Sequence, residues 1–140
     1  MPTMRKTPTI LRVMTPFPHF IDASASLDEA AEMMSHGFHH LPVKCDEELV
    51  GVVSERDVIL ARAAEQRSHV VLDVGAICSR PPFEVDVSQP LAWAVREMVR
   101  RHVDAVMVMR DDHLAGILTM TDACLLLAEL LDPEIEDVIA

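Results

Sequence analysis

Leu49-Val50-Gly51-Val52-Val53-Ser54-Glu55-Arg56-Asp57 occurs a second time, in altered form, as Leu114-Ala115-Gly116-Ile117-Leu118-Thr119-Met120-Thr121-Asp122. Both copies join a short apolar run, which is typical of a strand, to a Ser or Thr that precedes an Asp by three residues. That spacing ahead of an apolar segment indicates the N-terminus of a helix. The sequence therefore predicts, at two places, a strand that leads directly into a helix.

The duplication extends to both sides of this stretch. At an offset of 64 or, after one inserted residue, of 65, the two halves match over most of their length. A register this long indicates an internal repeat, and halves of about 60 residues, marginal alone, would share a core. The matched pairs include Met14 with Cys78, Pro18 with Pro82, Asp22 with Asp86, Ser24 with Ser88, Leu27 with Leu91, Met34 with Met98, Val43 with Val108 and Leu60 with Leu125.

Each half predicts the same order of elements. Apolar residues at helical spacing begin at Leu27 and at Leu91, and Gly37 is expected to end the first of these helices with a left-handed cap. β-branched runs separated by acidic turns then predict two hairpins. The expected strands are 40–45, 49–54, 105–109 and 114–119, the second helices are about 56–67 and 121–131, and 66–71 is the expected linker.

Composition narrows the class of protein. The 140 residues are 50% hydrophobic, which excludes intrinsic disorder. Asp and Glu number 23 against 12 Lys and Arg, so the formal charge of −11 argues against nucleic-acid binding. Three separated cysteines suit a reducing compartment better than a disulfide framework. No signal peptide or membrane-spanning stretch is evident, so we expect a soluble cytoplasmic protein.

The repeat resembles a tandem pair of CBS domains, also called a Bateman module. The first half carries Val13-Met14-Thr15-Pro16 and His39-His40-Leu41-Pro42-Val43, whereas the second departs at Val106-Met107-Val108, where the family prefers Leu-Pro-Val. The resemblance covers about residues 10–131. It implies an α/β fold of two quasi-symmetric β-α-β-β-α repeats, residues 10–66 and 71–131, packed through their sheets with clefts between them.

The resemblance also implies a function. CBS pairs bind adenosine-containing ligands, so we expect AMP, ADP, ATP, S-adenosylmethionine or a related compound, with no required cofactor. From the residues alone, helix capping is the stronger explanation of the repeated Ser/Thr and Asp, and the resemblance favours ligand contact instead. The expected ligand-binding residues are Gly51, Ser54, Asp57, His39, Leu41 and Pro42 in the first half and Gly116, Thr119, Asp122 and Val106 in the second.

Two other kinds of site were considered. His36, His39 and His40 suggest a metal site, but Gly37 should interrupt the helix that would bring them together, so no metal is expected. Ser54, Asp57 and His39 could be imagined as a catalytic triad. The second half has Asp104 where the first has His39, and no nucleophile elbow is visible, so we expect no enzyme. Asp104 also predicts that the second cleft binds phosphate less well.

The final helix predicts self-association. Residues 123–131 are apolar nearly all round, and a short chain has little with which to cover them. A homodimer is expected, with a regulated protein as a further possible partner. The alternative function is a dimerising or partner-binding protein that needs no ligand and has vestigial clefts. The cysteines are expected to act as small core residues.

Overall fold

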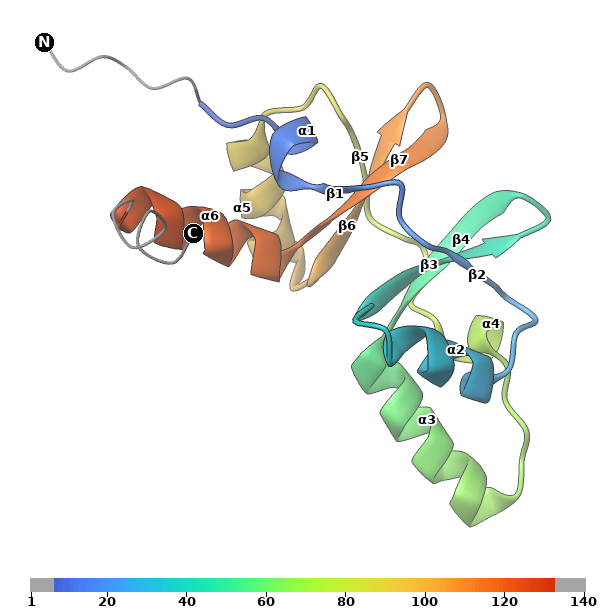
Figure 1. Ribbon diagram of the computed structural model, residues 1–140. Helices are drawn as coiled ribbons and strands as arrows, with labels where there is room; N and C mark the ends of the chain where they lie inside the picture. Colours follow the sequence, from blue (N-terminus) through green and yellow to red (C-terminus); the bar gives the residue numbers. More distant parts are fainter. Residues whose placement is uncertain (1–6, 133–140) are drawn as a thin grey trace, which may run out of the picture. The chain divides into compact units, whose positions relative to one another are not determined.

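The computed structural model describes residues 7–132, which form two compact units (Figure 1). Unit 2 is the continuous segment Pro18–Pro82. Unit 1 combines residues 7–17 with residues 83–132. Each unit has a small β-sheet, its own buried apolar core and flanking helices, so the protein has the mixed α/β architecture that the sequence predicts.

Unit 2 contains a three-stranded sheet in the order β2-β3-β4. β3 pairs with β4 in antiparallel fashion and with β2 in parallel, so β3 is the middle strand. The core residues Leu41 and Val53 lie on paired positions of this hairpin. The elements are β2 (Ile21–Asp22), α2 (Leu27–Met34), β3 (His40–Cys45), β4 (Glu48–Ser54), α3 (Glu55–Ser68) and α4 (Val74–Ile77).

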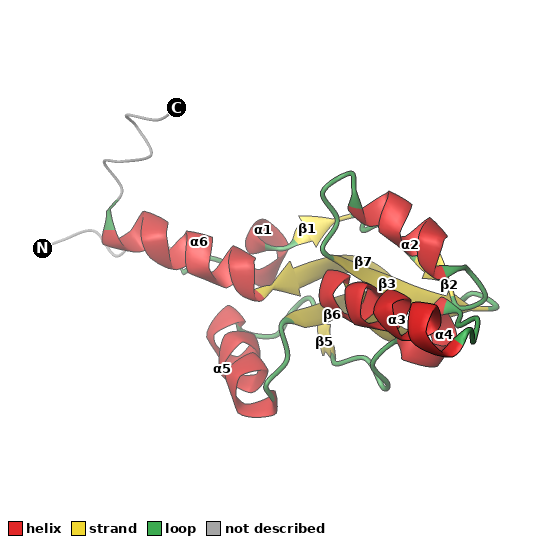
Figure 2. Cartoon of the chain, turned by 90° about the horizontal axis from the view of Figure 1, so that it is seen from below, coloured by secondary structure: helices red, strands yellow, loops and turns green. Residues whose placement is uncertain are grey.

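Unit 1 contains a four-stranded sheet in the order β1-β7-β6-β5. Its core repeats that of unit 2, with Val106 and Leu118 paired across the β6–β7 hairpin. α6 contacts both α1 and α5 (Figure 2). The elements are α1 (Ile10–Val13), β1 (Thr15–Pro16), β5 (Glu84–Asp86), α5 (Leu91–Arg101), β6 (Ala105–Arg110), β7 (His113–Thr119) and α6 (Met120–Leu131).

The segments before the first helix of each repeat are exchanged between the two sequence repeats. β1, which precedes the first repeat's helix, pairs with β7 of the second repeat. Ser79 makes the reciprocal exchange, because its backbone N–H and C=O both bond Val52 on β4. The compact units are therefore crossed with respect to the sequence repeats, because each unit contains a segment from the other half of the sequence.

Gly51 and Gly116 make these exchanges sterically possible. A Cβ atom on Gly51 would lie 2.6 Å from the carbonyl oxygen of Ser79, and one on Gly116 would lie 2.8 Å from that of Thr15. Such distances are shorter than van der Waals contact, so a side chain at either position would push the exchanged segment away. The glycine of the repeated motif thus has a structural role of its own.

Three local expectations need correction. α3 continues to Ser68 and ends at His69 in the left-handed conformation, so residues 66–68 of the expected linker are helical. Gly37 has the expected positive φ, but α2 ends earlier, at Met34, and a turn connects the two. Cys45 and Cys124 are exposed and are not core residues, whereas Cys78 is half-buried and packs against the core of unit 2. Among the described residues, no helix is long and apolar enough to cross a membrane.

Candidate functional site

The strand-to-helix junction of unit 2 is closed by a reciprocal pair of hydrogen bonds. The Ser54 Oγ atom accepts from the Asp57 N–H at 3.1 Å, and Asp57 Oδ2 accepts from the Ser54 N–H at 2.9 Å. Ser54 therefore caps α3, and Asp57 satisfies a backbone donor that the end of β4 would otherwise leave free. The helix-start interpretation of the motif is confirmed.

Unit 1 repeats this geometry at the start of α6. Thr119 Oγ1 accepts from the Asp122 N–H at 3.2 Å, and Asp122 Oδ2 accepts from the Thr119 N–H at 2.8 Å. The four residues that make these side-chain hydrogen bonds are all half-buried: Ser54, Asp57, Thr119 and Asp122. The two repeats thus present the same polar atoms on the same local backbone.

Capping leaves part of each junction available for a ligand. Asp57 and Asp122 each use Oδ2, and within residues 7–132 Oδ1 of neither residue has a hydrogen-bond partner. The hydroxyl groups of Ser54 and Thr119 accept a bond, and each still has a hydrogen to donate. One carboxylate oxygen and one hydroxyl hydrogen therefore remain at each helix start, a pair suited to a partner with its own hydroxyl groups.

The helix ends also carry opposing electrostatic effects. The N-terminus of a helix attracts anions through its dipole and its free N–H groups. Asp57 and Asp122 place a carboxylate in the same first turn, and Glu55 adds a second one in α3. A phosphate near either junction would meet this negative charge, so a further donor or cation would be needed to favour it.

His39 provides a candidate donor in unit 2 only. Its backbone carbonyl accepts from the Glu55 N–H at 2.9 Å, and its ring Nδ1 lies 2.6 Å from Glu55 Oε2. In unit 1 the carbonyl of Asp104 accepts from the Met120 N–H at 2.8 Å, so the backbone contact is kept. The side chains at these positions differ. The imidazole of His39 and the carboxylate of Glu55 form a pair in unit 2, whereas unit 1 has the carboxylate of Asp104 and the thioether of Met120 at the corresponding positions.

Leu41 and Val106 are placed differently from the polar residues. Both side chains are fully buried in the cores of their units. They lie one strand away from the junctions, paired with Val53 and Leu118. Only their backbone atoms can therefore take part in binding.

Pro42 marks a further difference between the halves. Met107, its counterpart, donates its N–H to the Phe83 carbonyl at 2.8 Å, and a proline has no N–H to make this bond. β3 is the middle strand of its sheet, but β2 pairs with it only at Val43 and Lys44. Pro42 lies opposite Val52 of β4 but beyond the residues of β3 that pair with β2, so its missing donor interrupts no bond to β2.

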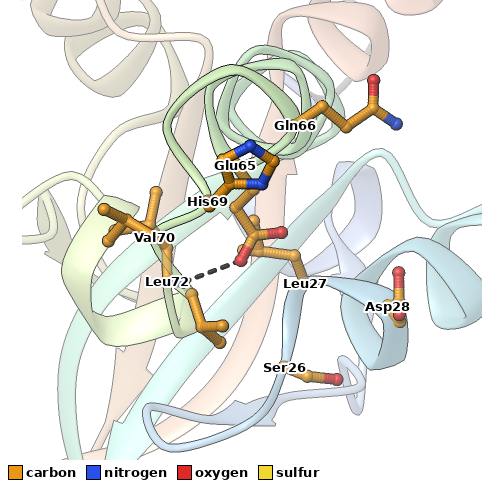
Figure 3. Close-up of a pocket in the computed structure, with 9 residues that line it drawn as sticks. Ser26, Leu27, Asp28, Glu65, Gln66, His69, Val70 and Leu72 are labelled. Carbon is orange, nitrogen blue, oxygen red and sulfur yellow. Dashed lines mark hydrogen bonds between the residues drawn. The ribbon is translucent and has the colours of Figure 1, made fainter.

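Two hollows formed by described residues lie away from these residues. One of about 390 Å³ lies between the start of α2 and the end of α3, where Glu65 accepts from the Leu72 N–H at 2.7 Å (Figure 3). A second, of about 220 Å³, lies between α2 and α3 and includes Glu55. None of the predicted ligand-binding residues lines either hollow, and no sequence signal pointed to them.

The histidine cluster does not converge. His36 Nε2 lies 3.5 Å from Glu32 Oε1 on α2, whereas His39 pairs with Glu55. Over residues 7–132 no group of three or more His, Cys, Asp and Glu side chains is arranged to hold a metal ion.

A repeated polar turn precedes the first helix of each half. Asp22 Oδ1 accepts from the Ser24 hydroxyl at 2.6 Å and from the Ser24 N–H at 2.8 Å. Asp86 makes the same two bonds with Ser88. These hydrogen bonds, side-chain bond first, lower the pKa of both aspartates below the ordinary value. The duplication aligns these residues, but the sequence analysis gave them no role.

Comparison with known families accounts for both halves. The CBS domain pattern matches residues 10–64 and residues 74–129. The chain therefore belongs to the CBS domain family and carries two copies of the domain. None of the curated protein sequences matches it.

Solved structures agree with this assignment. The CBS domain pair of protein MJ0100, in complex with 5′-methylthioadenosine and S-adenosyl-L-methionine, is 21% identical with a TM-score of 0.75, and the match covers 87% of this chain and 97% of that one. CBSX2 in complex with AMP is 27% identical with a TM-score of 0.70 and the same coverage, 87% and 97%. An uncharacterized conserved protein from Pyrococcus horikoshii is 24% identical with a TM-score of 0.72, over 86% and 92% of the two chains.

Proposed function

We propose that this protein is a regulatory module that reversibly binds an adenosine-containing ligand and catalyses no reaction. The observation that carries the proposal is the repeated junction, where Asp57 and Asp122 each accept the backbone N–H of the helix-capping residue and keep one carboxylate oxygen without a hydrogen-bond partner among the described residues. Two relatives of the same family support the ligand class, because one binds AMP and the other binds 5′-methylthioadenosine and S-adenosylmethionine.

Each polar atom has a proposed part in binding. The ribose hydroxyls donate to Oδ1 of Asp57 or Asp122, since an ionised carboxylate is the strongest acceptor at the junction. The Ser54 or Thr119 hydroxyl donates to the ligand's next oxygen. The adenine edge bonds to the backbone near Leu41 and Val106, whose buried side chains hold that backbone in place.

The two sites are proposed to differ in their tolerance of phosphate. Because Glu55 engages His39 Nδ1, the remaining Nε2 donates to a phosphate only when the ring is doubly protonated. Asp104 repels phosphate, so the second site favours ligands with fewer phosphate groups.

We also propose that the chain acts as a homodimer that regulates another protein. Four leucines of α6, Leu125, Leu127, Leu130 and Leu131, are 54–76% exposed. The same surface favours a second candidate function, in which the protein associates with its partners without any ligand.

A thermal-shift screen separates the two candidates. AMP, ADP, ATP, 5′-methylthioadenosine, S-adenosylmethionine and NAD are each added to the wild type at millimolar concentration. A ligand at about 100 times its dissociation constant should stabilise the fold by about 2.7 kcal/mol, which raises the melting temperature by several degrees. Guanosine and cytidine are the controls. An unchanged melting temperature with every adenosine compound contradicts the sensing function and favours the ligand-independent one.

A further inference from the structure

The hollow between the start of α2 and the end of α3 has no part in the proposed adenosine sites. Its volume of about 390 Å³ is within the range of about 300–1,000 Å³ that ligand pockets occupy. Leu27 and Leu72 supply apolar lining, and Asp28, Glu65 and His69 supply polar side chains around it (Figure 3). All of these residues belong to unit 2. The hollow is therefore formed within one compact unit and can receive a ligand of its own.

Glu65 is the positioned charge of this hollow. Its Oε2 atom accepts from the Leu72 N–H at 2.7 Å, which fixes the carboxylate, and within residues 7–132 its Oε1 atom has no hydrogen-bond partner. Asp28, on the other side of the hollow, is already paired with Arg62 at 3.2 Å. Glu65 has no ion-pair partner in the described part of the chain. A cationic group is therefore the ligand feature that its free oxygen would bind best.

The fold itself does not require these carboxylates. At the corresponding positions unit 1 has Leu130 for Glu65 and Ala92 for Asp28, and α5 still packs against α6. Glu65 is half-buried beside apolar lining, so its carboxylate loses part of its hydration. A bound cation would offset that loss, which the packing of the two helices does not explain.

The linker that borders the hollow offers unpaired backbone groups. Val70 and Val71 are 53% and 89% exposed, and within residues 7–132 none of their N–H and C=O groups has a hydrogen-bond partner. The linker continues into Asp73, whose backbone is extended and forms an isolated β-bridge with Ser26. Exposed β-branched residues with free backbone groups favour pairing with another extended chain. A peptide would use these groups, whereas a free cation would leave them unpaired.

We infer that this hollow docks an extended segment of the regulated protein in which a basic residue is flanked by apolar ones. The arginine or lysine of that segment bonds to Glu65 Oε1, its apolar neighbours contact Leu72 and the exposed valines, and its backbone bonds to Val70 or Val71. This inference rests on the proposed regulation of another protein, and it names the surface and the kind of segment that the surface recognises.

Fluorescence anisotropy with a defined probe tests the cation site. The probe is a labelled peptide with one central arginine between two valines and with serines at both ends. It should bind the wild type with a dissociation constant of about 0.1 mM. Glu65→Gln keeps an oxygen for the Leu72 N–H and should weaken binding about tenfold. Glu29→Gln, which removes an exposed carboxylate of α2 outside the hollow, is the control and should change binding less than about twofold.

A double-mutant cycle tests the pairing of the probe's arginine with Glu65. A probe with glutamine in place of arginine should bind the wild type about tenfold more weakly, and it should bind Glu65→Gln with little further loss, because both changes remove the same bond. Circular dichroism melts confirm that Glu65→Gln and Glu29→Gln fold. The comparison of two probes on the wild type needs no variant protein at all.

Amide hydrogen exchange tests the backbone contact. The N–H groups of Val70 and Val71 should exchange rapidly in the free protein, and a saturating concentration of the probe should slow at least one of them about tenfold. Spermidine, a cation without a peptide backbone, should slow neither. The Ala76 N–H, which already bonds Asp73, is the internal control and should be unaffected by the probe.

Each outcome decides one part of the inference. A probe that does not bind the wild type, or equal losses for Glu65→Gln and Glu29→Gln, overturns the docking site, whereas adenosine-ligand binding is tested separately by the thermal shift. Additive losses in the double-mutant cycle overturn the pairing with Glu65. Unchanged exchange at both valines, or spermidine that binds as tightly as the probe, overturns the assignment of a peptide to the hollow.

Discussion

The two units share a backbone plan and differ in the side chains placed on it. Both have a capped helix after the second strand of a hairpin, a glycine under an exchanged segment, and a polar turn before the first helix. Unit 2 adds a histidine beside its junction and charged helix surfaces, whereas unit 1 has a carboxylate and apolar surfaces. The shared features are those that hold the fold, and the differing ones are the basis of the proposed contrast between the two binding sites.

The shared feature with the largest expected effect is the glycine beneath each exchanged segment. Gly51→Ala and Gly116→Ala should each destabilise the fold by about 1–3 kcal/mol, as overpacking does. The losses should be similar, because a Cβ on Gly51 would lie 2.6 Å from the Ser79 carbonyl oxygen and one on Gly116 would lie 2.4 Å from Met14 Sδ and 2.8 Å from the Thr15 carbonyl oxygen. Chemical denaturation of both variants measures this.

Gly75→Ala is the matched control for the glycine variants. Its Cβ would lie 3.0 Å from the Ala23 carbonyl oxygen, and alanine favours the helix in which it stands. It should cost less than either of the other substitutions. Equal stability of all three variants and the wild type would show that the exchanged segments move freely.

The aspartates test whether the two junctions bind alike. Asp57→Asn and Asp122→Asn keep an oxygen that can accept the backbone N–H, so the free energy of unfolding should fall by less than about 1 kcal/mol. The affinity of the corresponding site for adenosine should fall about tenfold, because an amide is a weaker acceptor for ribose hydroxyls than a carboxylate. Calorimetric titration measures both sites.

Asp73→Asn provides the control for the junction variants, because Asp73 Oδ1 caps the short helix α4 by accepting from the Ala76 N–H at 2.9 Å. It should lower stability slightly and leave affinity unchanged. If Asp57→Asn behaves like Asp73→Asn, Asp57 has a structural role alone.

His39 and Asp104 test the difference between the sites directly. His39→Ala should weaken ATP binding about three- to tenfold and adenosine binding much less, since a charge-assisted hydrogen bond to phosphate is lost. Asp104→Asn should strengthen nucleotide binding at the second site by a similar factor. His36→Ala, which removes an exposed histidine paired with Glu32, is the control. Two equal sites, both unaffected by these changes, would refute the assignment.

The smallest effect is expected in both units, on the pKa values of the aspartates in the polar turns formed by Asp22 with Ser24 and by Asp86 with Ser88. The Ser24 and Ser88 bonds lower the pKa of Asp22 and Asp86 in the folded state. Their stabilising effect is therefore present above the unfolded-state pKa and is lost as the pH falls through the folded-state pKa. Ser24→Ala and Ser88→Ala should return each pKa toward its ordinary value, and NMR titration of the carboxyl carbons measures the change. Unchanged pKa values would show that other groups cause the shift.

The sequence predicted the hairpins and the capped helices because they depend on local signals. The expected strand 40–45 is observed as β3, and Ser54 and Thr119 begin α3 and α6 as their motif indicates. Self-similarity located the repeats, and matched positions predicted the contrast between His39 and Asp104. The hairpins and helix starts are encoded by residues close together in the sequence, and the repeats by residues separated by a constant offset.

What the sequence did not predict depends on contacts between distant segments. The pairing of Thr15 with Ile117 and the bond of His39 to Glu55 join residues that no periodicity connects. The apolar character of residues 123–131 predicted a helix buried on more than one face, whereas within the described residues Met120 and Leu126 of α6 pack against the core and no residue of the helix is buried. Leu126→Glu would therefore disrupt the fold of unit 1, and Leu125 is the cleaner probe of association.

The exchanged segments hold the two halves of the sequence together by strand pairing as well as by the covalent chain. A single cleavage beside Val71, which is 89% exposed, would release no half of the protein, because each fragment would still contribute a segment to the other's unit. Each sequence half thus supplies a segment that completes the unit formed mainly by the other half. One repeat expressed alone would lack the segment that pairs with its second hairpin strand and packs against its glycine. Both repeats are therefore needed to form either unit.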